Sequence, residues 1–333
     1  MTIRVLIYGL GPIGLTVARQ LAARDGFRIV GAVDIDPAKV GRDVGELAGL
    51  DRPVHVKVTP DARRALQQSK SHIAVMCTGS ILKNVLPQIE EVLKARVPIV
   101  ATTEELSYPV RRNAGLAKKI DGMARRAKVA VLSTGVNPGF VMDALPLTLT
   151  SICERIDAIS VSRVQDARLR RLPFQQKIGA GLSAAQFEAE VRRGQVKHVG
   201  FTESITMIAD ALGWSVDRIT DEVKPKMATE TVSSEFLAVD AGYVSGIIQD
   251  GIAYRHGKAV ITLHIEAYLG APQTYDSVKI EGVPNISMMI PGGAPGDSAT
   301  ASIVVNSIPK VLNAPPGLRT MRDLPLPSFF GGR

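Results

Sequence analysis

A strand, a glycine-rich loop and a helix follow one another at the start of the chain. The apolar run Ile3–Tyr8 is rich in β-branched residues, the loop reads GLGPIG, and apolar residues then recur at helical spacing over Ile13–Ala23. In such a loop the first glycine permits a tight turn, the second lets a pyrophosphate approach the backbone, and the third lets helix and strand pack closely. The helix N-terminus then faces the phosphates. The stretch predicts a dinucleotide site that includes Gly9, Gly11, Pro12, Ile13 and Gly14.

An acid follows the next predicted strand. Phe27–Val33 is apolar and is followed by Asp34, twenty residues after Gly14. A carboxylate at this position can bind the ribose hydroxyls of adenosine, and it repels a 2′-phosphate, which favours NAD over NADP. Lys39 and Arg42 lie just beyond and can offset part of that repulsion. The cofactor is therefore expected to be NAD or NADP.

Strands and helices continue to alternate through the first half of the chain. This pattern predicts an α/β fold of Rossmann type, in which helices cover a doubly wound parallel sheet. The further strands are expected at Ile73–Cys77, Val97–Ala101 and Val129–Ser133, with helices at Ile81–Ala95 and Arg111–Lys128.

The rhythm changes after about residue 150. Period-2 alternation predicts an α+β domain with a mixed or antiparallel sheet, one face of which is open. The strands are expected at Ile156–Gln165, Thr231–Val239, Tyr243–Tyr254, Ala259–Leu269 and Tyr275–Ile280, and the helices at Ala184–Arg193 and Glu203–Leu212. We expect a dinucleotide-binding domain over 1–148, completed by 308–333, and a substrate domain over 149–307. The Pro/Gly-rich end of the chain is expected to be an extended tail.

Composition excludes several classes of protein. The charge of +8 is spread over helix-like segments without a nucleic-acid signature, and aromatic residues make up only 5% of the 333 residues. No apolar run reaches the roughly 18 residues that a membrane span requires. The N-terminus lacks a secretory signal, and two distant cysteines, Cys77 and Cys153, fit a reducing cytoplasm. We predict a cytoplasmic protein that binds small molecules and has no nucleic-acid, membrane or metal site.

Three polar loops follow the later strands, where ligands of parallel sheets bind. They read CTGS, ATTEE and STGVNPGF. Small residues in the first loop let a nicotinamide ribose approach, and an asparagine in the third can orient the nicotinamide amide, although Asn before Pro is also a common turn start. The predicted cofactor contacts from these loops are Cys77, Thr78, Gly79, Thr102 and Asn137.

Two adjacent acids, Glu104 and Glu105, stand in the second loop. A capping box would use Thr102 as the cap and Glu105 as the residue that reaches back to its amide, leaving Glu104 free. Alternatively, both acids only favour a helix N-terminus electrostatically. A free carboxylate beside a nicotinamide suits amine oxidation, because it can take a proton from the ammonium and stabilise the iminium cation.

These motifs resemble a known family. GLGPIG, TTEELSYP, STGVNPGFVMDALP and RRLPFQQKIGAGLS are similar to 2,4-diaminopentanoate dehydrogenases and native amine dehydrogenases, which have a dihydrodipicolinate-reductase-like fold. The resemblance covers nearly the whole chain. It implies interconversion of an amine with a ketone plus ammonia, Glu104 as the acid/base, and a homodimer formed through the second domain. The paired histidines of dihydrodipicolinate reductase itself are missing here, so diaminopimelate synthesis is not expected.

A substrate such as 2,4-diaminopentanoate carries a carboxylate and a second amine, so its site needs a cation and an acceptor. Arg163 can supply a fork for the carboxylate, unless it is a solvated strand arginine. His264 lies on the polar face of its strand, as would a histidine with no role in binding. Phe140 is either an apolar wall of the site or simply core. The predicted substrate contacts are Phe140, Arg163, Asp166, Gln175 and His264, with Lys177 as a further candidate.

Two other functions remain open on the sequence alone. The chain could be another imine or keto-acid reductase of the same fold, or a dinucleotide sensor without turnover. Glu104 separates these possibilities, because a sensor needs no free acid beside the nicotinamide ring.

Overall fold

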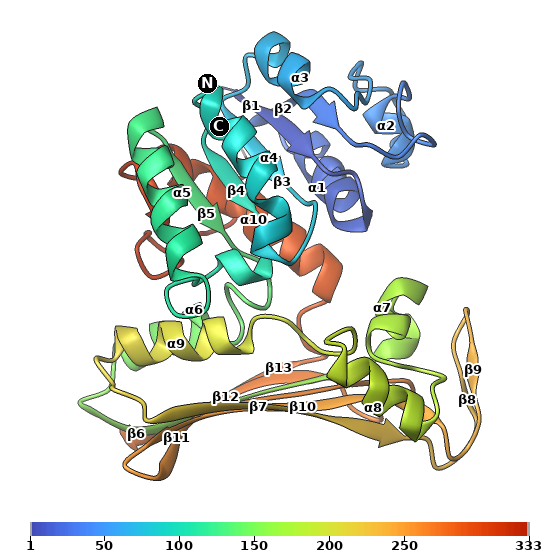
Figure 1. Cartoon of the computed structure of the whole chain (residues 1–333), viewed down its shortest axis with the longest axis vertical. Coiled ribbons are helices and arrows are strands. Elements are labelled where there is room, and N and C mark those ends of the chain that lie inside the picture. The colour runs from blue at the N-terminus through green and yellow to red at the C-terminus, as the bar shows by residue number, and fades with distance from the viewer. Residues whose placement is uncertain (1, 332–333) are drawn as a thin grey trace. The chain divides into compact units, whose positions relative to one another are not determined.

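The computed structural model describes residues 2–331, which belong to two compact units. Unit 1 ends at Phe140 and resumes at Pro295, whereas unit 2 comprises Val141–Ala294. Unit 2 is therefore inserted into the sequence of unit 1. Figure 1 labels the helices and strands of both.

Unit 1 is built on a parallel sheet, which has six strands in the described part of the chain. Its strands are short and almost wholly buried, as expected when helices cover both faces. The order is β14-β5-β4-β3-β1-β2, so the direction of strand addition reverses between β1 and β3, where ligands of such sheets bind. The bounds are β1 Ile3–Tyr8, β2 Phe27–Val33, β3 Ile73–Met76, β4 Ile99–Ala101, β5 Ala130–Ser133 and β14 Gly317–Arg319.

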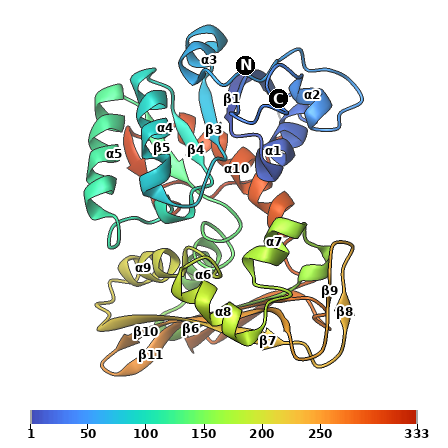
Figure 2. The same ribbon diagram turned by 45° about the vertical axis from the view of Figure 1, so that its right-hand side comes forward.

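Helices cover both faces of this sheet (Figure 2). On one face α1 packs against α10, which contacts β3, β4 and β5. On the other face α3, α4 and α5 form a row, and a large apolar cluster fills the space between this row and the sheet. The bounds are α1 Pro12–Ala22, α2 Val44–Leu47, α3 Ala62–Ser69, α4 Leu82–Lys94, the 3-10 helix η1 Glu104–Leu106, α5 Ala114–Ala127 and α10 Gly296–Leu312.

Unit 2 contains a mixed sheet in the order β13-β12-β6-β11-β10-β7. The pair β6 and β11 is parallel, and the other neighbours are antiparallel. The bounds are β6 Arg155–Asp166, β7 Arg218–Met227, β10 Val244–Arg255, β11 Lys258–Tyr268, β12 Tyr275–Val283 and β13 Ile286–Pro291. A separate hairpin pairs β8 Val232–Ser233 with β9 Ala238–Val239.

The helices of unit 2 leave one face of its sheet open. In Figures 1 and 2, α7, α8 and α9 lie on the same side of the sheet, and no helix of the described residues covers the other side. Phe187 of α8 and Ile247 of β10 belong to the apolar cluster beneath the helices. The bounds are α6 Ala144–Thr150, the 3-10 helix η2 Ala167–Leu169, α7 Leu172–Lys177, α8 Ala184–Arg192 and α9 Phe201–Ala211.

The predicted fold class is confirmed, and the main differences lie late in the chain. The run expected as one strand over Thr231–Val239 is a hairpin of two short strands. β7 escaped prediction because Pro225 interrupts its pattern, but β7 is an edge strand, where proline is tolerated. Within the tail that was expected to be extended, Gly317–Arg319 joins the first sheet as β14. The last two residues of that tail lie outside the described residues.

Both boundaries between the two units lie earlier in the sequence than expected. The expected junctions were 148/149 and 307/308, whereas the units change at 140/141 and 294/295. The second shift has a clear cause. Gly296–Leu312 is one continuous helix that packs on α1, so the whole helix belongs to unit 1.

Candidate active site

Two glycines of the first loop are required by the packing of the protein itself. Gly9 has a φ of +93°, and a Cβ there would lie 2.6 Å from the carbonyl oxygen of Cys77. A Cβ on Gly14 would lie 1.9 Å from the carbonyl oxygen of Gly9. Both substitutions would force the backbone apart, so these glycines fix the contact between β1, β3 and α1.

Gly11 differs from these two glycines, because the packing of the described residues does not require a glycine at this position. Its φ of −65° suits any residue, and a Cβ there would meet no atom of the described chain within 4 Å. Helix α1 begins at this residue without a side-chain cap among the described residues, so its first N–H groups face outward. A pyrophosphate would explain both features, because it needs free amides and a close approach to the backbone. The loop therefore fits a dinucleotide.

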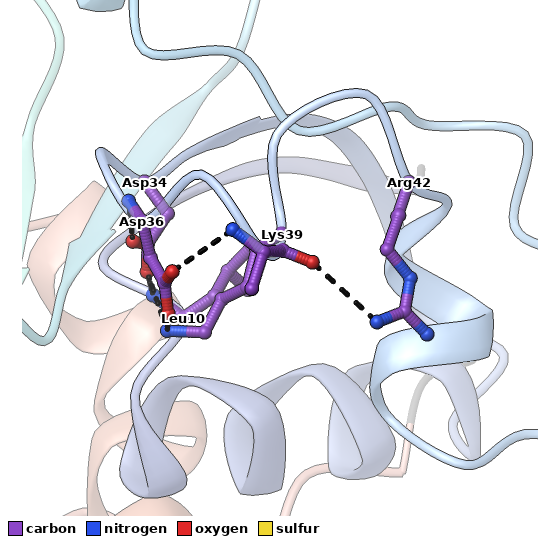
Figure 3. Close-up of polar contacts among 6 residues, drawn as sticks. Leu10, Asp34, Asp36, Lys39 and Arg42 are labelled. Atoms are coloured by element: carbon purple, nitrogen blue, oxygen red, sulfur yellow. Dashed lines mark hydrogen bonds and ion pairs between the residues drawn. The ribbon is translucent and has the colours of Figure 1, made fainter.

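Asp34 ties the end of β2 to this loop. One carboxylate oxygen accepts a hydrogen bond of 2.7 Å from the Leu10 amide, and the other accepts 2.9 Å from the Asp36 amide (Figure 3). The side chain is only 11% exposed. A carboxylate offers about four acceptor positions, so Asp34 can still accept from ribose hydroxyls.

Two cations lie near Asp34 in unequal positions. The Lys39 ammonium is 3.4 Å from Asp34 and 3.1 Å from Asp36, so it partly neutralises both acids (Figure 3). Arg42 turns away and pairs with Glu46 at 2.7 Å. Lys39 is therefore the cation that tunes the charge at the ribose position.

The loops after β3, β4 and β5 meet at the same edge of the sheet. The amide of Cys77 donates to Tyr8, that of Thr102 to Met76, and that of Thr134 to Ala101. Thr78 donates its hydroxyl hydrogen bond to Gln88 of α4. Burial raises the pKa of the Cys77 thiol to about 12, so this group stays protonated and unreactive.

The two adjacent acids have different environments, and the predicted capping box is wrong. Thr103 caps η1, with no side-chain cap bond among the described residues, and Glu105 instead accepts 2.8 Å from the Leu82 amide at the start of α4. Glu105 therefore caps a helix that begins 23 residues earlier in the sequence. The half-buried carboxylate of Glu104 has neither a hydrogen-bond nor an ion-pair partner in the described part of the chain.

The backbone around Glu104 is held firmly. The Ser107 hydroxyl donates 2.7 Å to the Glu104 carbonyl, and the Ser133 hydroxyl donates 2.7 Å to that of Thr103. The Glu105 amide donates 3.2 Å to Ser80 of the CTGS loop. These bonds hold the backbone at Glu104 between the loops that follow β3 and β5.

The third loop contributes two further predicted residues. Asn137 and Phe140 are both half-buried, and both belong to unit 1. The hydroxyl of Thr300 on α10 accepts 3.3 Å from the Val136 amide and so holds this loop against the unit. Phe140 was expected among the substrate residues, but it is the last residue of unit 1 before the chain enters unit 2.

Arg163 is neither solvated nor a free fork. It is 2% exposed, its guanidinium lies 3.0 Å from the carboxylate of Asp276, and it also donates to the Ala294 carbonyl. The Ala294 amide donates 2.7 Å to Asp276, which closes the group. The donors of Arg163 that were expected to bind a substrate carboxylate are thus engaged within unit 2.

Two other predicted substrate residues also serve the structure. Gln175 is fully buried, donates to the carbonyls of Ala167 and Arg170, and accepts from Ser234. Asp166 accepts from the Arg168 side chain and backbone and from the Gly270 amide. These contacts shape the turn from β6 to α7 and leave little capacity for a ligand.

His264 lies on the open face, among acids. Its Nδ1 is 2.7 Å from Asp250 and its Nε2 is 3.3 Å from Glu266, while Glu266 also pairs with Lys226 at 3.4 Å. This acidic environment suits a cation better than a carboxylate. Within unit 2, His264 is on the face of the sheet opposite Arg163, because neighbouring strand positions alternate.

Sequence reasoning missed several buried polar residues of unit 2. Asp276 could have been found, because it occupies an inward position of an alternating strand beside Val278 and Ile280. Gln249, which is fully buried in β10, could have been found in the same way. His198 lies in the loop between α8 and α9, and no pattern in the sequence indicates where its side chain lies.

No helix of the described residues is long and apolar enough to cross a membrane. Within residues 2–331, no group of three or more His, Cys, Asp or Glu side chains is arranged to hold a metal ion.

Comparisons with known proteins match both halves of the chain. The model of the 2,4-diaminopentanoate dehydrogenase C-terminal domain matches residues 140–332, and that of the dihydrodipicolinate reductase N-terminus matches residues 3–117. The 2,4-diaminopentanoate dehydrogenase of Acetoanaerobium sticklandii is 33% identical over 346 residues, covering 99% of this chain and 95% of that protein. An amine dehydrogenase of Streptomyces virginiae is 24% identical and covers 99% of this chain and 98% of that protein.

A solved structure gives the same result. The amine dehydrogenase from Mycobacterium smegmatis superposes with a TM-score of 0.89 at 26% identity and covers 100% of this chain and 99% of that chain. The fold, the glycine loop and the similarity over the full length of the chain all indicate the same family. The chain therefore belongs to the 2,4-diaminopentanoate dehydrogenase family.

Proposed function

We propose that this protein is an NAD(P)-dependent amine dehydrogenase that converts an amine to a ketone plus ammonia and catalyses the reverse reductive amination. Its relatives carry the names 2,4-diaminopentanoate dehydrogenase and amine dehydrogenase. The observation that carries the proposal is the unpartnered carboxylate of Glu104, held at the edge of the sheet where the dinucleotide loops meet.

The chemistry requires one acid/base group near the reacting carbon. In sum, an ammonium substrate, oxidised cofactor and water give a ketone, an ammonium ion, reduced cofactor and a proton. The bound nicotinamide accepts hydride in one direction and supplies it in the other. Glu104 takes a proton from the ammonium, so that the amine lone pair can assist hydride loss, and its charge stabilises the iminium. In reverse Glu104 protonates the departing hydroxyl of the carbinolamine.

We propose that the enzyme uses both NAD and NADP. Asp34 disfavours a 2′-phosphate. However, the Lys39 ammonium partly neutralises Asp34 and Asp36, and it can also form an ion pair with a phosphate (Figure 3). Arg42 is half exposed, pairs with exposed Glu46 and donates a long hydrogen bond of 3.5 Å to the Ala38 carbonyl (Figure 3), so it can turn toward a phosphate at small cost.

We propose further that the protein is a cytoplasmic homodimer. Both cysteines are free, which fits a reducing compartment. The open face of the sheet in unit 2 carries partly exposed apolar residues such as Ile248, Ile252 and Met289, and a second copy of the chain would cover them.

The test compares the two adjacent acids. Wild type, Glu104→Gln and Glu105→Gln are offered 2,4-diaminopentanoate and simple amines with NAD or NADP, and reduced nicotinamide is followed by absorbance. We expect Glu104→Gln to lower kcat by about 10²- to 10⁴-fold while cofactor binding stays intact. Glu105→Gln keeps a carbonyl for the Leu82 amide and should stay within a few-fold of wild type. A wild-type protein that binds cofactor but oxidises no amine would contradict the proposal.

A further inference from the structure

Unit 1 contains a cavity that the dinucleotide loop and Glu104 do not use. Its volume is about 390 Å³, within the range of about 300–1,000 Å³ that is typical of small-molecule sites. Three segments line it, namely the residues that follow η1, the N-terminal half of α5, and β14 with the residues after it. All three segments belong to unit 1, so the cavity lies within one unit.

The cavity is separate from the dinucleotide loop. The strand order places β14 at the outer edge of the sheet, three strands from β3 and four from β1. Neighbouring strands are about 4.8 Å apart, so β14 lies roughly 14 Å from β3 and farther from the GLGPIG loop. Neither Glu104 nor a residue of that loop lines the cavity. A molecule in the cavity would therefore bind in addition to the cofactor.

The floor of the cavity is apolar. Pro109 and Ala117 are buried there, Leu318 of β14 is half-buried, and the side chain of Tyr108 is 7% exposed. Apolar surface that lines a cavity is stabilised by contact with the apolar part of a ligand. The lining therefore favours a molecule with an apolar body over a small hydrated ion.

Two cations of the lining have no carboxylate partner. Lys118 of α5 forms neither a hydrogen bond nor an ion pair within the described part of the chain. Arg322 donates 3.0 Å from Nη1 to the Tyr108 hydroxyl and forms no ion pair among residues 2–331. The Nε and Nη2 edge of its guanidinium thus keeps its donors for the two oxygens of an anionic group.

The two acids of the lining are already bound within the protein. Asp121 pairs with Arg125 at 2.7 Å, which neutralises its charge. Asp323 accepts 2.8 Å from the Thr320 amide and 2.7 Å from the Thr320 hydroxyl. The two cations therefore outweigh the one acid whose charge is not matched, and the cavity attracts an anion.

We propose that this cavity binds a small organic anion, whose carboxylate or phosphate is bound by Lys118 and Arg322 and whose apolar part contacts the floor. The charge of the ligand is matched by an ammonium and a guanidinium fork, and its body covers the apolar surface of Pro109, Ala117 and Leu318. The site does not depend on the proposed amine dehydrogenase activity, because binding there requires no turnover.

The test measures binding by calorimetry in excess NAD, which occupies the dinucleotide site. The probes are benzoate, phenyl phosphate and benzyl alcohol, which is neutral and close in size to benzoate. We expect dissociation constants of about 1 mM or lower for the anions and binding about tenfold weaker for the alcohol. The anion that binds more tightly identifies the head group. Equal binding of benzoate and benzyl alcohol would overturn the proposal, because the two cations would then contribute nothing.

Three variants locate the bound anion. Lys118→Met should weaken its binding about three- to fivefold, the value of an exposed ion pair. Arg322→Met should weaken it about tenfold or more, because a guanidinium binds an anion through two hydrogen bonds. Val110→Trp narrows the cavity at its exposed rim without a change of charge, and it should weaken the binding of both anions. Unaltered binding by all three variants would place the anions elsewhere.

Lys119→Met is the matched control. Lys119 is the next residue of α5, is also exposed, pairs with Glu90 and does not line the cavity. Its removal changes the net charge as much as that of Lys118 and should change the affinity less than about 1.5-fold. An equal loss of affinity for the two lysine variants would show a general charge effect and contradict the site. Thermal unfolding checks that each variant is folded.

Discussion

Two acids of unit 1 and the buried arginine of unit 2 are held in different ways. In unit 1, acids bind backbone amides, as Asp34 binds the amides of Leu10 and Asp36 and Glu105 binds that of Leu82. In unit 2, the buried guanidinium of Arg163 instead depends on a side chain, the carboxylate of Asp276. A backbone amide is always present at a helix start or a glycine loop, whereas a side-chain partner must be supplied by a distant residue. At Asp34 and Glu105 of unit 1 the partner is thus a backbone amide, whereas Arg163 of unit 2 depends on a carboxylate from a distant strand.

Breaking the buried pair of unit 2 should have the largest effect on stability. Arg163→Met leaves Asp276 buried and unpaired, which should lower the free energy of unfolding by about 3–5 kcal/mol in urea titrations. The double variant Arg163→Met/Asp276→Leu removes both charges and should recover a good part of that loss. If the single variant were as stable as wild type, the distinction between the two units would fail.

The next largest effect should be a dependence of the free energy of unfolding on pH, which comes from His198. Its pKa in the folded protein is about 3, below the usual 6.5, so the unfolded chain takes up this proton first as the pH falls. Stability that is present at pH 7 is therefore lost as the pH falls toward 3, by about 2 kcal/mol between pH 7 and pH 5. Burial is the main cause of the lowered pKa, and the positive charges of Lys177, Arg163 and Arg170 contribute to it. Urea titrations at both pH values should show a smaller loss for His198→Phe, and an equal loss would assign the effect to other groups.

Unit 1 offers a comparison between two glycines. Gly11→Ala places a methyl group where nothing of the described protein lies, so unfolding should be little changed while NAD binding weakens by at least about tenfold, or 1.4 kcal/mol. Gly14→Ala meets the Gly9 carbonyl and should instead destabilise the fold. Calorimetric binding and thermal unfolding measure the two properties. Unaltered NAD binding by Gly11→Ala would place the pyrophosphate elsewhere.

The smallest effect should come from Glu105. Glu105→Ala removes the cap of α4 and should cost about 1 kcal/mol in the free energy of unfolding. Turnover per folded molecule should remain within a few-fold of wild type. A collapse of kcat comparable to that of Glu104→Gln would mean that the two acids act as a pair and that their separate roles are wrong.

Most of unit 1 could be predicted from sequence because its signals are local. Ile3–Tyr8 and Phe27–Val33 were expected with the observed bounds, since β-branched runs end at a glycine loop and at Asp34. The role of Glu105 was not predicted because the capping box assumes a partner in the same turn, whereas the observed partner belongs to another helix. Local rules describe which groups need partners, and only the fold decides which partner is nearest.

The polar residues of unit 2 were predicted less well for the same reason. Arg163 and Asp276 are 113 positions apart, and neither neighbourhood alone indicates the other. The alternation of β6 did place Arg163 on the same face as Ile159 and Val161, which is the buried face. A charged residue at an inward position predicts a buried partner without naming it. His198 depends on a clamp by Gln249, 51 positions away.

The late position of α10 has a consequence for biogenesis. Gln20 and Arg24 of the N-terminal segment bond to Ser302 and Asn306 of α10, and β14 is the strand that pairs with the outer edge of β5. While a ribosome synthesises residues 141–294, which takes roughly 8–30 s, the nascent first sheet has one face that lacks α10 and an edge that lacks β14. The dinucleotide motif emerges first, yet the unit that holds it is completed last. A nascent chain arrested before residue 295 should therefore depend on chaperones, although it already contains the glycine loop and both adjacent acids.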